Sequence, residues 1–125
     1  MMENDKTAKR IINVVCDYFD LPQEQVLGTS RKRQYVIARQ MAMILMRENT
    51  TLSTTDIGGY FAGEGKGGKD HSTVIYACTT IRDSMEWVYG PKTIAEHLET
   101  LRTLVKQKTA MQYPIYITRY ATQAS

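Results

Sequence analysis

The chain has 125 residues, a formal net charge of +3, and 42% hydrophobic against 23% charged residues. This length and composition predict one folded domain with a single core, and they exclude an intrinsically disordered chain or two full-sized domains. No apolar run approaches the roughly 18 residues that span a bilayer, and the first residues lack the apolar segment of a signal peptide, so we expect a cytoplasmic protein with no membrane partner.

Three helices are expected in the first half of the chain. Residues 5–20 carry apolar side chains at helical spacing along one face, and residues 23–27 form a short second helix that ends at a glycine. Residues 34–48 predict a central helix whose apolar stripe faces the core. We expect three polar side chains of this helix to lie off its buried face: Arg39, Gln40 and Arg47.

The loop before the central helix concentrates positive charge. Between Thr29 and Arg47 the chain has five basic residues and no acidic one, and Arg31, Lys32 and Arg33 are consecutive. Such a cluster favours a positive face that meets nucleic-acid phosphates, whereas a solvated loop can have the same composition. The charge pattern alone leaves both interpretations open.

A helix-turn-helix is predicted in the second half of the chain. Ser53, with Asp56 three residues later, begins a short helix as an approximate capping box, and a glycine-rich turn over residues 63–69 follows. Asp70 is a good N-cap for the next helix, which has a polar first turn and which we expect to end at Gly90. Its later turns carry an apolar stripe that we expect to face the core: Val74, Cys78, Ile81, Met85 and Val88.

A final helix is predicted from Pro91, with an apolar stripe of Ile94, Leu98, Leu101 and Val105. This stripe can pack on the domain or on a protein partner, including a second copy of the chain, and intramolecular packing is the simpler expectation. The sequence thus predicts an all-α fold, with a single helical domain over residues 1–110 that contains the helix-turn-helix and an additional C-terminal helix. Residues 111–125 are expected to form an extended or flexible tail.

No enzyme site, metal site or cofactor is predicted. Residues 63–69 match the spacing of a phosphate-binding loop, but Asp70 stands where a hydroxyl ligates magnesium and no buried strand precedes the turn, so no nucleotide is expected. The chain has two cysteines and two histidines, none of them at metal-ligand or catalytic spacing: Cys16, Cys78, His71 and His97. We expect both cysteines to be reduced core residues.

The segment from Gly67 to Cys78, GGKDHSTVIYAC, resembles the signature of the C-terminal DNA-binding domain of the bacterial chromosomal replication initiator DnaA. Three upstream segments follow in the order that this family uses: the basic residues 31–33, RQMAM at residues 39–43, and DIG at residues 56–58. The resemblance covers roughly residues 8–90. It includes neither the ATPase module nor the N-terminal partner-binding domain of that family.

The resemblance implies sequence-preferring binding of double-stranded DNA, in replication initiation at origin boxes or in its regulation, without catalysis. Four residues match family positions that contact bases, the first of them in a minor groove and the others in a major groove: Arg31, Asp70, His71 and Ser72. Others match positions that hold or adjoin phosphates: Lys32, Arg33, Arg39, Gln40, Arg47, Lys69 and Thr73.

This chain departs from the family pattern mainly at the turn. Phe61 precedes Asp70 by nine positions instead of four, so five extra residues, 62–66, enlarge the turn. A loop insertion costs little stability, so we expect the recognition helix to be retained. The alternative function is a non-catalytic protein–protein adaptor, or a transcription regulator, that retains the fold.

Overall fold

The computed structural model describes residues 2–61 and 71–111 of the chain. The elements in these residues are α1 (Met2–Phe19), α2 (Gln23–Val26), α3 (Arg33–Asn49), α4 (Thr54–Gly58), α5 (His71–Asp83), β1 (Val88–Tyr89), β2 (Lys92–Thr93) and α6 (Ile94–Met111). The predicted all-α class is confirmed, and a short hairpin joins α5 to α6. The enlarged turn and the tail lie outside the described residues.

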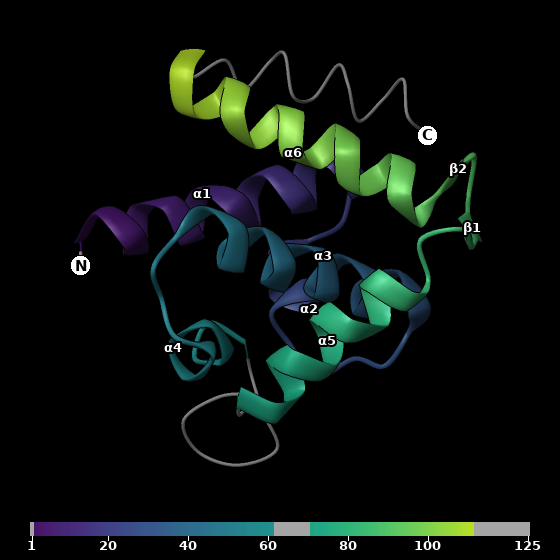
Figure 1. The fold of residues 1–125 in the computed structure, drawn as a ribbon, viewed down its shortest axis with the longest axis horizontal. Coiled ribbons are helices and arrows are strands. Elements are labelled where there is room, and N and C mark those ends of the chain that lie inside the picture. Colours follow the sequence, from purple (N-terminus) through teal and green to yellow (C-terminus); the bar gives the residue numbers. More distant parts are fainter. Residues whose placement is uncertain (1, 62–70, 112–125) are drawn as a thin grey trace.

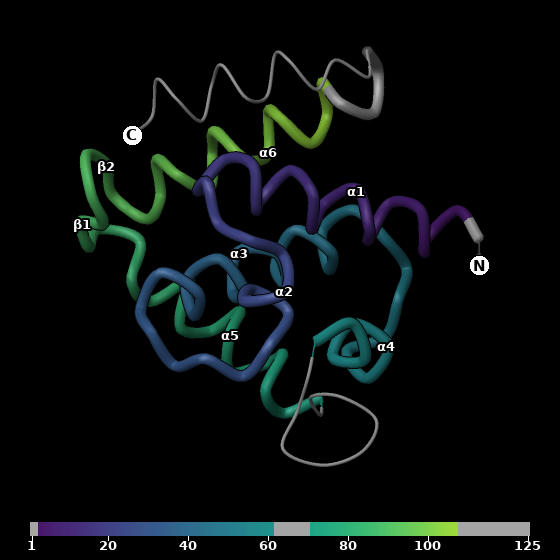
Figure 2. The backbone as a smooth tube through the Cα atoms, turned by 180° about the vertical axis from the view of Figure 1, so that it is seen from behind, coloured from purple at the N-terminus to yellow at the C-terminus, as the bar shows by residue number. Residues whose placement is uncertain are grey.

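Helix α3 is the centre of the fold. Both backbone views show α1 and α6 side by side on one side of the molecule and α4 and α5 on the other, with α3 between them (Figures 1 and 2). Because α3 is covered from two sides, seven of its apolar residues are buried: Ile37, Ala38, Met41, Ala42, Met43, Leu45 and Met46. The methionines therefore fill the core, and the alanines let neighbouring helices approach closely.

The end of α1 sets the direction of the segment that carries the positive charge. Leu21 N donates to Cys16 O at 2.9 Å and Asp20 N donates to Asp17 O at 3.2 Å, while Asp20 adopts a left-handed φ of 55°. This pair of bonds is the Schellman arrangement, and the proline that follows prevents the helix from continuing. The chain then turns into α2 and the loop before α3.

The expectation that the recognition helix ends at Gly90 is wrong, because α5 ends at Asp83. Val88, expected to face the core, lies in β1 and is 62% exposed. Gly90 has a φ of +67° in the two-residue turn between β1 and β2, a conformation that a side chain disfavours. Pro91 belongs to this turn and does not open the last helix.

Helix α6 begins instead at a capping box. Glu96 N donates to Thr93 Oγ1 at 3.2 Å, and Thr93 N donates to Glu96 Oε1 at 2.8 Å. The apolar stripe of α6 is buried in the common core against α1, and its members are Ile94, Leu98, Leu101, Leu104 and Val105. The expected intramolecular packing of this helix is confirmed.

His97 connects three parts of the fold. Its side chain is 3% exposed, and its Nε2 donates to Tyr89 O at 2.7 Å. Because a carbonyl can only accept, Nε2 carries the proton and Nδ1 accepts from the Tyr18 hydroxyl at 2.8 Å. Burial lowers the pKa of His97, which favours this neutral form. Helix α1, the hairpin and α6 are therefore joined through one buried imidazole.

Both cysteines are buried and free, as expected. Burial raises the pKa of Cys16 to about 12, so its thiol stays protonated and unreactive. In the described part of the chain, no helix is long and apolar enough to cross a membrane.

Candidate nucleic-acid interface

The two helices of the predicted helix-turn-helix are α4 and α5, and the segment between them, residues 62–70, lies outside the described residues. The Ser53 hydroxyl accepts from Asp56 N at 3.0 Å, which confirms the predicted N-cap of α4. Ile57 and Phe61 are buried between this helix and its neighbours. Behind the exposed face of α5, four residues are buried and anchor the helix on α3 and α4: Val74, Ala77, Cys78 and Ile81.

The first turn of α5 faces away from this anchor. His71 and Ser72 are exposed, and Thr73 is half-buried. No acidic residue lies in the first turn of the described helix. His71 and Ser72 thus present hydrogen-bonding side chains at the surface. Two further residues expected here, Lys69 and Asp70, lie outside the described residues.

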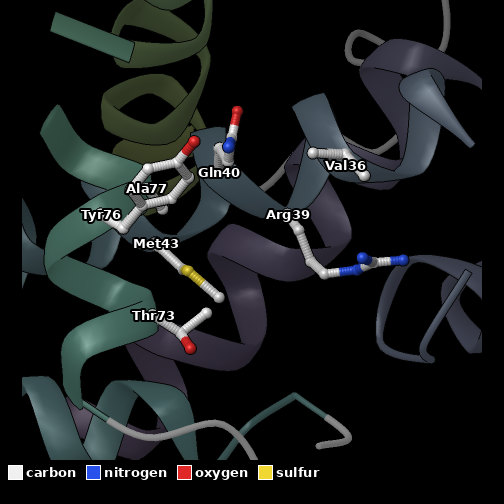
Figure 3. Close-up of a pocket in the computed structure, with 7 residues that line it drawn as sticks. All are labelled: Val36, Arg39, Gln40, Met43, Thr73, Tyr76 and Ala77. Atoms are coloured by element: carbon white, nitrogen blue, oxygen red, sulfur yellow. The ribbon is translucent and has the colours of Figure 1, made fainter. Parts of the chain in front are cut away.

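A hollow between α3 and α5 brings together residues from both helices. Its lining includes Gln40 and Met43 of α3 and Thr73, Tyr76 and Ala77 of α5 (Figure 3). Three expected phosphate-binding residues, Arg39, Gln40 and Thr73, therefore line the same hollow although Thr73 is far from the other two in the chain.

Tyr76 is a residue of this surface that the sequence interpretation missed. It is 69% exposed and lines the hollow beside Thr73. It stands four residues after Ser72, which places the two side chains on one side of the helix. The four-residue spacing from Ser72 could have predicted that Tyr76 lies on the exposed face. The apolar stripe used for the prediction marks only the opposite, buried face.

Arg39 does not lie off the buried face as expected. Its side chain is 6% exposed and points away from α5, toward the segment between α2 and α3 (Figure 3). Nε donates to Val26 O at 2.6 Å, and Nη2 donates to Ser30 O at 2.7 Å and to Gln25 O at 3.3 Å. Burial lowers the pKa of Arg39, but these three carbonyl acceptors compensate Nε and Nη2 for their loss of water.

The expectation that Arg39 lies off the buried face is therefore wrong, and its expected role as a phosphate contact stays a prediction. Its donors are directed at the backbone just before the basic loop, so Arg39 positions that loop. The physical reason is geometric. A planar guanidinium has several N–H donors, so it can bind several carbonyls of the segment between α2 and α3 at once.

The basic loop presents its three cations at the surface. Arg31, Lys32 and Arg33 are exposed, and Lys32 N donates to Ser30 Oγ at 3.3 Å. Arg47 is also exposed, in the last turn of α3. Arg39 is thus buried, whereas four residues expected to contact phosphates or a groove are exposed: Arg31, Lys32, Arg33 and Arg47.

Arg33 makes a contact that the sequence did not indicate. Its Cζ lies 5.2 Å from the centre of the Tyr89 ring, and its Nη2 donates to Val88 O at 3.4 Å. The start of α3 is thereby attached to the hairpin after α5, 55 residues later in the chain. In the described part of the chain, no group of His, Cys, Asp and Glu side chains is arranged to hold a metal ion.

Fold and side-chain geometry are those of a helix-turn-helix domain whose basic loop contacts the hairpin after α5 through Arg33. Residues 8–81 match the family model described as the bacterial dnaA protein helix-turn-helix. The chain belongs to this family.

Three relatives illustrate the match, and each is a chromosomal replication initiator protein DnaA. The protein of Bacteroides fragilis is 43% identical over 95 residues, which cover 76% of this chain and 19% of that protein. The Synechococcus sp. protein is 41% identical over 99 residues (76% and 20%), and the Cutibacterium acnes protein is 48% identical over 83 residues (66% and 16%). The chain spans about a fifth of the length of the relatives it matches.

Proposed function

We propose that this domain binds double-stranded DNA with sequence preference in the cytoplasm, in the initiation of replication or its regulation. The observation that carries the proposal is the orientation of α5, whose rear residues are buried while His71 and Ser72 are exposed in its first turn. A helix anchored in this way can enter a major groove with its N-terminal side chains against base edges. The relatives are called chromosomal replication initiator proteins, and this name supports the proposed part in the initiation of replication.

The proposed contacts divide into those that specify sequence and those that position the protein. His71 and Ser72, with Asp70, contact bases in the major groove, and Arg31 enters the neighbouring minor groove. The proposed phosphate contacts are Lys32, Arg33, Gln40, Arg47, Lys69 and Thr73. In this proposal the residues bind DNA and neither catalyse a reaction nor hold a cofactor.

The adaptor alternative places the partner on the last helix or on the tail, and the tail lies outside the described residues. The apolar stripe of α6 is covered by α1, so it is not free to bind a partner helix. Arg102 also holds α6 to the end of α3, because its Nε and Nη2 donate to the two carboxylate oxygens of Glu48 at 3.0 and 2.6 Å. DNA binding is therefore the function that this geometry supports best.

Fluorescence anisotropy tests the proposal directly. The chain is titrated into two labelled duplexes of equal length and base composition, one with the box sequence of bacterial replication origins and one with that sequence scrambled. We expect at least about tenfold tighter binding to the box duplex, since specific binding commonly exceeds non-specific binding by far more. Equal affinities for the two duplexes would contradict sequence preference.

A further inference from the structure

Two pairs of large apolar side chains are exposed on the described surface. Ile75 and Tyr76 belong to α5 and are 46% and 69% exposed, and Trp87 and Val88 belong to the hairpin region and are 65% and 62% exposed. The first pair lies on the proposed base-reading helix. The side chains of the second pair have no part in the core or in the contacts assigned above, and adjacent exposed apolar side chains can mark an interaction site where they form one patch.

The hairpin that carries the second pair is firmly held. The Tyr89 ring packs at 6.0 Å from the Phe19 ring and 5.8 Å from the His97 ring, measured between centroids. Ile94 N donates to Trp87 O at 2.8 Å, which fixes the backbone of Trp87 itself. An isolated two-stranded hairpin is only marginally stable, so these contacts with α1 and α6 hold it in place. Trp87 is therefore presented to solvent from a fixed backbone.

The basic loop and the hairpin form one continuous surface. Arg33 belongs to the run of three cations and also lies over Tyr89 and donates to Val88 O. The exposed apolar pair thus adjoins the cations proposed to bind phosphates and a minor groove. Glu86 and Lys92 of this region carry opposite formal charges, so the hairpin adds apolar surface and the basic loop supplies the attraction for phosphate.

We propose that the β1–β2 hairpin is a second DNA-contacting element, in which Trp87 and Val88 pack against sugars and base edges of the minor groove beside the basic loop. Apolar side chains meet DNA in this way in proteins that bind the minor groove. The inference rests on the proposed DNA-binding function, and it extends the interface beyond the recognition helix to the connection between α5 and α6.

Trp87 reports on its own surroundings because it is the single tryptophan of the chain. When the box duplex is titrated into the chain, we expect the tryptophan emission to be quenched and its maximum to shift. Trp87→Ala should lower the affinity for the box and the scrambled duplex alike by at least about fivefold, the loss expected when about 40 Å² of apolar contact is removed.

Two variants serve as controls. Trp87→Phe keeps an aromatic ring and should retain most of the affinity. Thr103→Ala changes an exposed side chain on α6, away from the hairpin, and should bind as the unaltered chain does. Trp87 is exposed, so Trp87→Ala should unfold at nearly the same denaturant concentration as the unaltered chain, which circular dichroism checks.

The outcomes separate this inference from the proposed function. If the unaltered chain prefers the box duplex while Trp87→Ala binds equally well and the emission does not change, the hairpin contact is wrong and the proposed function stands. If the unaltered chain shows no preference for the box, the proposed function itself fails. If sedimentation without DNA shows a dimer that Trp87→Ala abolishes, the hairpin binds a second copy, which overturns its role as a DNA contact.

Discussion

Replacing Arg39 by alanine should destabilise the domain far more than a surface substitution does. The change removes Nε and Nη2, which donate to the carbonyls of Val26, Ser30 and Gln25. It leaves Val26 O without this donor in a buried position and releases the segment between α2 and α3. The effect tests the assignment of Arg39 as a residue that positions the basic loop.

The expected magnitude follows from the burial of each acceptor. The bond to Val26 O is buried, and a hydrogen bond from a charged donor there contributes about 1.5–3 kcal/mol. The other two bonds are only partly buried, so water replaces them at a smaller loss of about 0.5–1 kcal/mol each. Removing the buried charge also ends its desolvation cost, which offsets part of the loss. We therefore expect the free energy of unfolding to fall by about 2–4 kcal/mol.

Urea unfolding followed by far-ultraviolet circular dichroism measures this difference. Arg47→Ala is the matched control, because Arg47 is an exposed arginine on the same helix and its loss should change stability by less than about 0.5 kcal/mol. Arg39→Lys keeps the charge without the planar fork and should fall between the two. If Arg39→Ala is as stable as Arg47→Ala, the guanidinium does not hold the loop and the assignment is refuted.

Three further predictions concern DNA binding and pH. His71→Ala and Ser72→Ala should each lower affinity for the box duplex by about 1–3 kcal/mol and for scrambled DNA very little, and equal losses on both in anisotropy titrations would show that α5 does not read bases. Binding should weaken with salt at a log–log slope of about −4 to −5, reduced by about one unit in Arg47→Ala, whereas a slope near zero would exclude the proposed phosphate contacts. Because burial lowers the pKa of His97 below its ordinary value of 6.5, the unfolded chain binds the proton first and stability should fall as pH decreases below about 7. His97→Gln, which can still donate to the carbonyl of Tyr89, should flatten this dependence in urea unfolding at a series of pH values.

The sequence determined the order and type of the helices and the location of the recognition helix. Apolar residues at three- and four-residue spacing fix which face of a helix is buried, and this signal is local. It correctly predicted the burial of Val74, Cys78 and Ile81 on α5, and Ser53 was correctly identified as a cap. The motif beginning at Gly67 also led to the family that the comparison shows.

The end of α5 was decided by tertiary structure. The periodic pattern continues through Met85 to Val88 without an interrupting glycine or proline, so the sequence favours a helix up to Gly90. The chain instead leaves the helix after Asp83 and packs Tyr89 against α1 and α6. Helical spacing cannot reveal such contacts, because the groups that stabilise the hairpin lie far away in the sequence.

The positions of Arg39 and His97 were likewise decided only by the folded chain. A polar side chain in a helical pattern is normally assigned to the surface, yet the Arg39 guanidinium is buried against carbonyls of the α2–α3 segment. His97 had no expected role, and the fold places its two nitrogens between a hydroxyl and a carbonyl. Every residue has a backbone carbonyl, whatever its type. The sequence therefore does not show at which point of the fold several carbonyls come close enough to accept from one side chain. A polar side chain can be buried only where such acceptors or donors surround it, and only the tertiary structure brings them together.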